Sequence, residues 1–245
     1  MIEVRDLRVR YGTRTVAHVP ELDVGAGECV AVVGESGSGK STTLMALLGL
    51  TEGAEVSGHV RVCGVDVLTA PAGRLREIRG ARVALVMQSP QAALSPTTRL
   101  GVLMRRALDL HGMEAGERAM AEAVEAVLLD PAILRRYPHE VSGGQAQRFA
   151  IALALALGAE VVLADEPTSA LDVTVQAEVV GVLRRLREER GLALLLVSHD
   201  LALVSTIADR VLVMKDGAVV ESGPAARVLA EPSHPYTREL LEALP

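Results

Sequence analysis

The stretch that decides the fold is Gly34-Glu35-Ser36-Gly37-Ser38-Gly39-Lys40-Ser41. It satisfies the phosphate-loop pattern G-x-x-x-x-G-K-[ST]. A short apolar run at residues 28–33 precedes it and predicts a buried strand, and residues 41–50 follow it with helical spacing. Because a strand, a glycine-rich loop and a helix come in this order, the sequence predicts an α/β fold built around a phosphate-binding loop.

The residue types in this loop suit an anionic ligand. Glycines let the backbone curl so that N–H groups point inward, and the start of the helix adds the positive end of its dipole. We expect Lys40 to reach the β- and γ-phosphates of a nucleotide and the Ser41 hydroxyl to coordinate Mg²⁺. An ordinary glycine turn before a helix is the alternative interpretation. Lysine is rare in this chain, since Lys40 and Lys215 are the only lysines among 25 basic residues, so a lysine at this position by chance is improbable. Lys215, beside the predicted turn at Asp216-Gly217, is expected to be a solvated hairpin residue.

The composition indicates one globular core with a sizeable insertion. The 245 residues are 49% hydrophobic and 23% charged, which excludes a disordered or collagen-like chain. A net charge of −6 without blocks of like charge argues against electrostatic binding to nucleic acid or anionic lipid. The longest apolar run, residues 149–159, is too short to cross a bilayer, and the charged first residues are unlike a signal peptide. Cys29 and Cys63 alone make no disulfide framework or zinc site, so we expect buried thiols in a reducing cytoplasm.

Apolar runs outline the core. Residues 3–10 alternate polar and apolar side chains and predict a strand near the N-terminus. Residues 83–87, 161–164 and 192–197 are compact apolar runs, which are typical of buried parallel strands. Near the other end of the chain, residues 210–222 predict a hairpin, and a short helix is expected after Pro235.

A region of helical periodicity interrupts this core. Residues 100–110 and 117–129 have helical spacing, and β-branched runs are scarce around them. We therefore predict a helical insertion at residues 89–157 within a single domain, 1–245, whose core consists of residues 1–88 and 158–245.

Two acidic residues, Asp165 and Glu166, follow the predicted strand at residues 161–164. Successive strand residues point to opposite sides, so we expect Asp165 to hold Mg²⁺ and Glu166 to face a water molecule near the γ-phosphate. Without the phosphate loop upstream, a solvated strand end or a helix cap would be the better interpretation. His199 ends the last apolar strand and is either structural or a contact to the γ-phosphate.

A second glycine-containing helix start stands in the insertion. In Val141-Ser142-Gly143-Gly144-Gln145, Ser142 can cap the following apolar helix while the two glycines leave backbone N–H groups accessible. Alone this is a common helix start. Since this helix start stands in the insertion, remote from the loop at residues 34–41, we expect it to serve the nucleotide of another subunit.

These motifs, in this order, resemble the ATP-binding-cassette (ABC) ATPases over nearly the whole chain. The loop is similar to the family's Walker A motif, Gln88 to its Q-loop, residues 141–145 to its signature, and residues 161–166 to its Walker B motif. Residues 169–172 resemble its D-loop and His199 its switch histidine. Tyr11 lies where the family has an aromatic residue that stacks on adenine, although a core tyrosine is the alternative. The resemblance implies a P-loop NTPase core of the RecA-like, ABC type with an inserted α-helical subdomain and an N-terminal antiparallel β region.

The resemblance also assigns the site residue by residue, with ATP and Mg²⁺ as ligands. The catalytic residues are expected to be Lys40, Glu166 and His199. The Mg²⁺ ligands are expected to be Ser41, Gln88 and Asp165. The ATP-binding residues are expected to be Tyr11, Gly34, Glu35, Ser36, Gly37, Ser38, Gly39, Lys40, Ser41, Thr42, Gln88, Ser142, Gly143, Gly144 and Gln145.

Finer matches favour the branch that imports peptides and nickel into bacteria. They are the segments at residues 88–90, 94–96, 137–140, 169–176 and 234–238. Three features depart from the family pattern: Val141 replaces leucine, Ala146 replaces arginine beside the signature, and the chain ends at Pro245 without a cysteine-bearing tail. No iron–sulfur cluster is therefore expected.

The resemblance implies a peripheral protein on the cytoplasmic side of the cell membrane. Its expected partners are a second ABC ATPase subunit, identical or different, the permease subunits and, indirectly, a substrate-binding protein. One alternative is an ABC-type ATPase of a soluble multi-enzyme complex, such as one for phosphonate breakdown. A cassette protein acting on nucleic acid is the other, and the acidic charge and the lack of a long coiled-coil insertion argue against it.

Overall fold

The computed structural model describes residues 1–114, 116–169 and 171–242, and in these residues ten strands form one sheet. The strand order across the sheet is β5-β4-β1-β2-β10-β9-β3-β8-β7-β6. The strands are β1 (Ile2–Tyr11), β2 (Arg14–Val24), β3 (Cys29–Val33), β4 (Glu55–Val62), β5 (Val65–Asp66), β6 (Val83–Val86), β7 (Val161–Asp165), β8 (Ala193–Val197), β9 (Arg210–Lys215) and β10 (Ala218–Pro224).

The central strands are parallel, as the compact apolar runs predict. β3 pairs in parallel with β8 and β9, and β7 pairs in parallel with β8 and β6. Every residue of β3 and of β8 is buried, because helices cover both faces of this part of the sheet. The phosphate loop therefore begins at the end of a strand that its neighbours hold on both sides.

The N-terminal part of the sheet is antiparallel. β1 pairs with β2 on one side and with β4 on the other. The alternation at residues 3–10 gives β1 its inward-facing residues, including Val4, Leu7 and Val9, all fully buried. The expected antiparallel β region beside an α/β core is thus confirmed, although β2 and β4 were not identified individually from the sequence.

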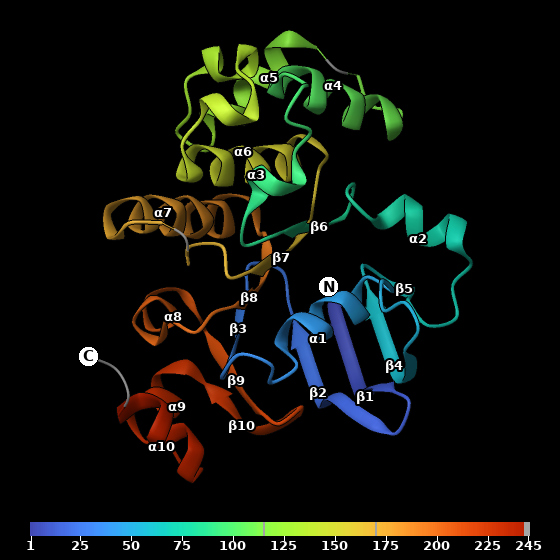
Figure 1. Cartoon of the computed structure of the whole chain (residues 1–245), viewed down its shortest axis with the longest axis vertical. Coiled ribbons are helices and arrows are strands. Elements are labelled where there is room, and N and C mark those ends of the chain that lie inside the picture. Colours follow the sequence, from blue (N-terminus) through green and yellow to red (C-terminus); the bar gives the residue numbers. More distant parts are fainter. Residues whose placement is uncertain (115, 170, 243–245) are drawn as a thin grey trace.

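Helices cover the sheet and form a separate layer at one end of the molecule (Figure 1). No helix among the described residues is both long and apolar enough to cross a membrane. The helices are α1 (Lys40–Leu47), α2 (Ala72–Ile78), α3 (Pro90–Ala93), α4 (Leu100–Leu110), α5 (Glu117–Glu125), η1 (Pro131–Arg135), η2 (Pro138–Glu140), α6 (Gly143–Ala156), α7 (Val173–Arg190), α8 (Leu201–Ile207), α9 (Ala225–Ala230) and α10 (Pro235–Glu242).

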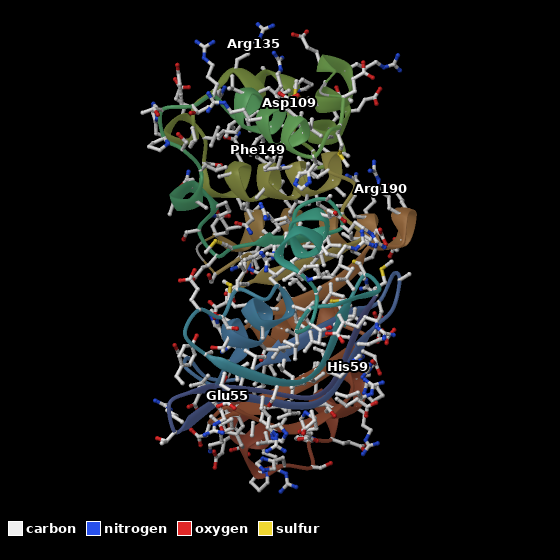
Figure 2. The ribbon with its side chains drawn as sticks, turned by 90° about the vertical axis from the view of Figure 1, so that its right-hand side faces the viewer. Glu55, His59, Asp109, Arg135, Phe149 and Arg190 are labelled. Carbon is white, nitrogen blue, oxygen red and sulfur yellow. The ribbon has the colours of Figure 1, made fainter. Side chains whose placement is uncertain are left out.

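The helical layer contains α3 to α6, which agrees with a helical insertion. Figure 2 shows Phe149 within this layer, and its fully buried ring belongs to the same apolar cluster as Leu100, Met104 and Val124. The cluster continues to Val162 on β7, so the layer shares a core with the sheet. The exact division at residues 89 and 157 stays a prediction.

Two helices are shorter than their periodicity predicts. α1 ends at Leu47 because the N–H of Leu50 turns back to bond the Met45 carbonyl at 2.9 Å. α5 ends at Glu125, and Leu128 beyond it adopts a left-handed conformation with φ 59°. Beyond these ends, Leu48 and Val127 are buried, whereas Leu50 and Leu128 are exposed, so apolar spacing in the sequence overstates both helices.

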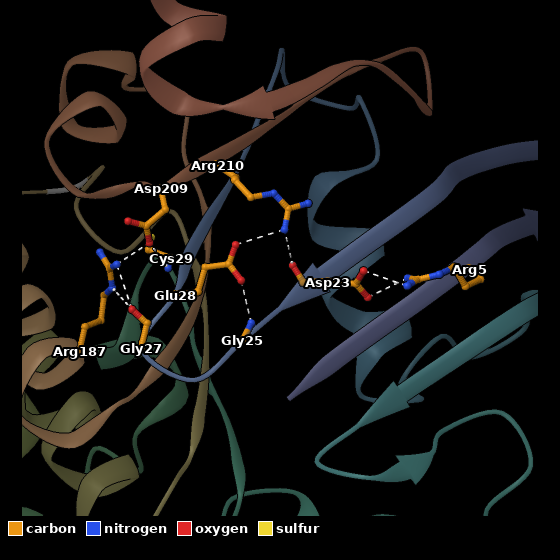
Figure 3. A network of polar contacts seen from close by, with 9 residues as sticks. All are labelled: Arg5, Asp23, Gly25, Gly27, Glu28, Cys29, Arg187, Asp209 and Arg210. Atoms are coloured by element: carbon orange, nitrogen blue, oxygen red, sulfur yellow. Dashed lines mark hydrogen bonds and ion pairs between the residues drawn. The ribbon is translucent and has the colours of Figure 1, made fainter.

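A polar network fixes the beginning of β3, at the end opposite to the phosphate loop (Figure 3). Arg187 of α7 pairs with Asp209 at 2.5 Å, and the same Asp209 oxygen accepts the backbone N–H of Cys29 at 2.8 Å. Beside it, Arg210 pairs with Glu28 at 3.1 Å. These charged groups tie β3 to α7 and β9.

Candidate functional site

The loop between β3 and α1 has the conformation that only glycine allows at two of its positions. Gly34 has φ +147°, and a Cβ there would lie 2.1 Å from the Met214 carbonyl oxygen. Gly39 has φ +99°, and its Cβ would lie 2.4 Å from the Val16 carbonyl oxygen. Both positions exclude any larger residue without movement of the backbone.

Lys40 is held against the loop that it follows. Its ammonium donates hydrogen bonds to the carbonyl oxygens of Gly34 at 2.8 Å and Glu35 at 2.7 Å, and the residue is only 6% exposed. Burial lowers the pKa of this ammonium, while the nearby Glu166 and Asp165 carboxylates act in the opposite direction. The side chain therefore places a positive charge beside the loop backbone.

A cavity of about 450 Å³ lies over the loop, which is within the size range of small-molecule sites. Half of the predicted site residues line it, together with Arg14 and Val16, which the sequence analysis did not identify. The lining consists of Arg14, Val16, Ser36, Gly37, Gly39, Lys40, Ser41, Thr42, Gln88, Asp165 and Glu166.

Asp165 and Glu166 both line this cavity, and the strand-alternation argument for separating them is wrong. β7 ends at Asp165, and Glu166 has φ 46°, so the chain turns between the two residues. The Ser41 hydroxyl donates a hydrogen bond to Asp165 Oδ1 at 3.1 Å. Burial raises the pKa of Asp165, and the Glu166 charge adds to this, whereas the Ser41 hydrogen bond and Lys40 oppose it.

The chemistry of these donors fits a magnesium ion. A hydroxyl oxygen and a carboxylate oxygen face each other at the rim of the cavity, and Mg²⁺ prefers oxygen ligands. Gln88 also lines the cavity, but its amide nitrogen bonds Ser169 Oγ at 2.8 Å and approaches Glu166 Oε2 at 3.4 Å. Gln88 thus connects the end of β6 to the acidic pair.

Glu166 has polar neighbours from three segments of the chain. Besides Gln88, His199 Nδ1 lies 3.2 Å from Glu166 Oε2, and the Ser169 hydroxyl donates to the Glu166 backbone carbonyl at 3.2 Å. The His199 side chain is 62% exposed and that of Glu166 23% exposed. The structure therefore brings His199 to the acidic pair. Of the D-loop segment, Ala170 lies outside the described residues, as does Pro245.

The segment at residues 142–145 lies away from the cavity, at the start of α6. Ser142 caps the helix as predicted: its hydroxyl accepts the Gln145 N–H at 3.2 Å, and the Gln145 side chain accepts the Ser142 N–H at 3.0 Å. A Cβ on Gly144 would lie 2.1 Å from Val175 of α7, so the glycine allows close packing there. None of the residues 142–145 lines the cavity over the phosphate loop in the described part of the chain.

Tyr11 lies at the end of β1 and is 44% exposed, outside the residues that line the cavity. Its stacking on adenine stays a prediction. Gly34, Glu35 and Ser38 belong to the loop without lining the cavity. Ser38 is buried, and among the described residues its hydroxyl has no hydrogen-bond partner.

Comparisons with known proteins place this chain in a family. The ABC transporter family model matches residues 18–169. A Brucella abortus protein named as a peptide import ATP-binding protein is 46% identical over 226 residues, covering 89% of this chain and 68% of the relative. A peptidoglycan transport ATP-binding protein of Agrobacterium fabrum is 42% identical over 258 residues, covering 100% of this chain and 47% of the relative.

Solved structures of ABC cassettes have the same fold. The ATP-binding cassette MJ0796, in a dimeric post-hydrolysis state bound to ADP and Pi, superposes with a TM-score of 0.80 at 28% identity, covering 92% of this chain and 99% of the other. The Clostridium perfringens protein cbiO1, part of the ABC transporter complex cbiONQ, gives 0.81 at 25% identity, covering 94% and 90%. With its phosphate loop, acidic pair and signature segment, this chain belongs to the ABC transporter family as an ATP-hydrolysing cassette subunit.

Proposed function

We propose that this chain hydrolyses ATP to drive a bacterial peptide importer. The observation that carries the ATPase function is the single cavity that gathers Lys40, Ser41, Asp165 and Glu166. The relatives named for peptide and peptidoglycan transport support the peptide class of cargo. These names do not extend to nickel, the other cargo of the branch that the sequence resembles.

The positions of the side chains support an in-line attack of water on ATP. Lys40 neutralises charge on the β- and γ-phosphates, and Glu166 orients the water and accepts its proton. The water oxygen bonds to the γ-phosphorus, the bond to the bridging oxygen breaks, and ADP and phosphate leave. His199, 3.2 Å from Glu166, is placed to stabilise the charge that develops on the γ-phosphate.

Ser41 and Asp165 are the residues that would hold Mg²⁺, with Gln88 as the third candidate at the same rim. When bound, the ion neutralises phosphate charge and fixes the position of the phosphate oxygens. This chain contributes the oxygen donors and keeps the Asp165 carboxylate close to the Ser41 hydroxyl.

A second ATPase subunit completes the site in this proposal. Residues 142–145 lie on α6, away from the loop of their own chain, and a similar cassette is dimeric. Two chains arranged head to tail would bring Ser142 and the glycines of one chain to the ATP on the other. ATP would close the pair of subunits, and hydrolysis would reopen it.

We further propose that the closing motion reaches a permease. Gln88 lies between the cavity and the helical layer, since β6 ends just before it and α3 begins just after it. The cassette cbiO1 belongs to a transporter complex, which supports a permease partner for this chain. The chain would then bind the permease from the cytoplasmic side of the membrane, and a substrate-binding protein would deliver the peptide to that permease.

Isolation of the native complex tests this function. The chain is affinity-tagged in its own cell, the complex is crosslinked and extracted from membranes with detergent, and its subunits are identified by mass spectrometry. We expect polytopic permease subunits and an ABC ATPase. Soluble lyase subunits without a permease would instead indicate the multi-enzyme alternative, which no observation here favours. The Glu166→Gln variant should recover the same partners but without ATP turnover.

A further inference from the structure

One motif of the sequence has no part in the site described above. Residues 234–238, His-Pro-Tyr-Thr-Arg, open α10 and lie beyond the part of the chain that the family model matches. Tyr236 in this motif is only 2% exposed, although α10 lies at the edge of the molecule (Figure 1). A buried aromatic residue with a polar end usually has a hydrogen-bond partner.

The partner of Tyr236 is the phosphate loop. The backbone N–H of Glu35 donates a hydrogen bond to the Tyr236 hydroxyl at 2.9 Å, across 201 residues of sequence. A side chain of the last described helix thus contacts the backbone at the beginning of the loop.

This hydrogen bond also bears on Lys40. The peptide unit between Gly34 and Glu35 is trans, so its N–H and its C=O point in opposite directions. The N–H of this unit bonds Tyr236, and its C=O, which belongs to Gly34, accepts the Lys40 ammonium at 2.8 Å. One rigid peptide plane therefore connects the tyrosine hydroxyl to the lysine charge.

Several contacts fix the position of the tyrosine ring. The ring packs in an apolar cluster with Val33 of β3 and Val213 of β9. Lys215 Nζ lies 4.4 Å from the ring centroid, so the expectation that Lys215 is only a solvated hairpin residue is wrong. The lysine is partly buried.

The turn before α10 is equally well held. Glu221 accepts the backbone N–H groups of Ser233 at 2.8 Å and His234 at 3.0 Å. His234 Nδ1 accepts the Tyr236 N–H at 3.2 Å, and Arg238 donates to the carbonyl of Ser233 at 3.1 Å. The start of α10 is thus anchored to β10 and offers the hydroxyl in one position.

We propose that Tyr236 is a positioning residue for ATP hydrolysis: its hydroxyl fixes the Gly34–Glu35 peptide plane and thereby the place where Lys40 holds its charge. The inference rests on the proposed ATPase function, because Lys40 matters through the phosphates that it contacts. Tyr236 itself does not touch the nucleotide. Its effect reaches the phosphates through the loop backbone.

The test is Tyr236→Phe, which keeps the ring, its packing and the Lys215 contact while removing one hydroxyl. Loss of one hydrogen bond to the loop should lower kcat/KM for MgATP by about 3- to 10-fold. Thermal stability should change little. The Glu35 amide, followed by NMR or hydrogen exchange, should lose protection.

The matched control is Tyr137→Phe, which removes the same group from a tyrosine that contacts His139 and Arg99 instead of the loop. It should leave kcat/KM and the Glu35 amide unchanged. The inference is overturned if Tyr236→Phe alters only thermal stability, or if kcat/KM is unchanged while the Glu35 amide exchanges faster. A wild-type protein that hydrolyses no ATP would contradict the proposed function itself. Equal ATPase activity of the wild type and the Tyr236→Phe variant would contradict only the positioning role of Tyr236.

Discussion

The two carboxylates at the end of β7 are adjacent in sequence but have different surroundings. Asp165 accepts the Ser41 hydroxyl, and burial raises its pKa. Glu166 faces Gln88 and His199. The first is therefore placed beside the hydroxyl that we propose to bind Mg²⁺, and the second beside polar groups that can orient water, so their substitutions should have different effects.

Glu166→Gln should separate binding from chemistry. Glutamine keeps the size and reach of the side chain but cannot accept a proton, so turnover should fall on the order of 10²-fold or more while MgATP stays bound. Steady-state ATPase assays and equilibrium nucleotide titration measure the two effects. Asp165→Asn serves as the comparison and should weaken Mg²⁺-dependent affinity. A Glu166→Gln protein that turns over at the wild-type rate would assign the base to another group.

Lys40→Ala should abolish tight ATP binding. The ammonium is the cation that the loop holds at its own backbone, through the Gly34 and Glu35 carbonyls, and phosphate recognition depends on such a charge. Titration with a fluorescent ATP analogue measures the dissociation constant. Arg118→Ala is the control, since this exposed cation pairs with Glu122 on α5 and lies outside the residues that line the cavity. An unchanged dissociation constant for Lys40→Ala would mean that the loop is only a turn.

Sequence analysis located the part of the site that lies in one continuous motif. The spacing of the loop glycines, Lys40 and Ser41 alone predicts a phosphate-binding loop, and Gly37, Gly39, Lys40 and Ser41 line the cavity. Arg14 and Val16 were missed because they reach the cavity from β2, and Tyr236 because it reaches the loop from α10. Tyr11 lies close to Arg14 in the sequence, but no pattern assigns Arg14, Val16 or Tyr236 themselves to a nucleotide site. The pairing of β2 with β10 and the packing of α10 bring them there.

At the scale of elements, apolar runs predicted the parallel strands well, because residues buried on both faces of a sheet are uniformly apolar. α7 was not predicted as an element, since its sequence mixes valines and arginines with weak periodicity. Its last turn nevertheless has a structural role: Arg187 donates to the Gly27 carbonyl at 3.1 Å and pairs with Asp209, which holds the Cys29 N–H (Figure 3).

The position of Cys29 at the beginning of β3 makes stability sensitive to alkaline pH. Burial raises the pKa of the Cys29 thiol to about 12. The unfolded chain ionises this thiol above its ordinary pKa, whereas the folded chain keeps it protonated. Unfolding free energy should therefore fall as the pH rises from 9 towards 12, by up to about 1.4 kcal/mol per pH unit from this group.

Denaturant titrations at pH 8 to 11, under reducing conditions, measure this effect as the difference between the wild type and Cys29→Ala. The difference should change with pH, because alanine has no proton to lose. Cys63→Ala is the matched control: its thiol is also buried and has a raised pKa, but it is less enclosed and should give a smaller change. If the free energies of unfolding of the wild type and Cys29→Ala differ by the same amount at every pH in this range, the raised pKa of the Cys29 thiol is contradicted.

At the scale of the whole molecule, we propose a nucleotide site that two chains share. The cavity over the loop contains residues from β2, the loop, α1 and the ends of β6 and β7, whereas Ser142 and its glycines open α6 in the helical layer (Figure 1). Two chains placed head to tail would complete two equivalent sites. The sequence analysis predicts this sharing because the signature stands in the insertion, and in the structure residues 142–145 do not line the cavity over the loop.

Mixed dimers test this arrangement. A Lys40→Ala chain has a broken loop and an intact signature, and a Ser142→Arg chain has the reverse, so neither should hydrolyse ATP alone. A mixed dimer contains one site made from the intact loop of one chain and the intact signature of the other. A one-to-one mixture should therefore recover up to about a quarter of the wild-type turnover, since about half of the dimers are mixed and each has one working site.

The control mixture, Lys40→Ala with Glu166→Gln, breaks the loop side of both chains and should recover none. Native mass spectrometry counts the mixed dimers and the ATP that they retain. Mixed dimers that neither turn over nor retain ATP, or equal recovery in the control mixture, would show that the two segments do not share a nucleotide.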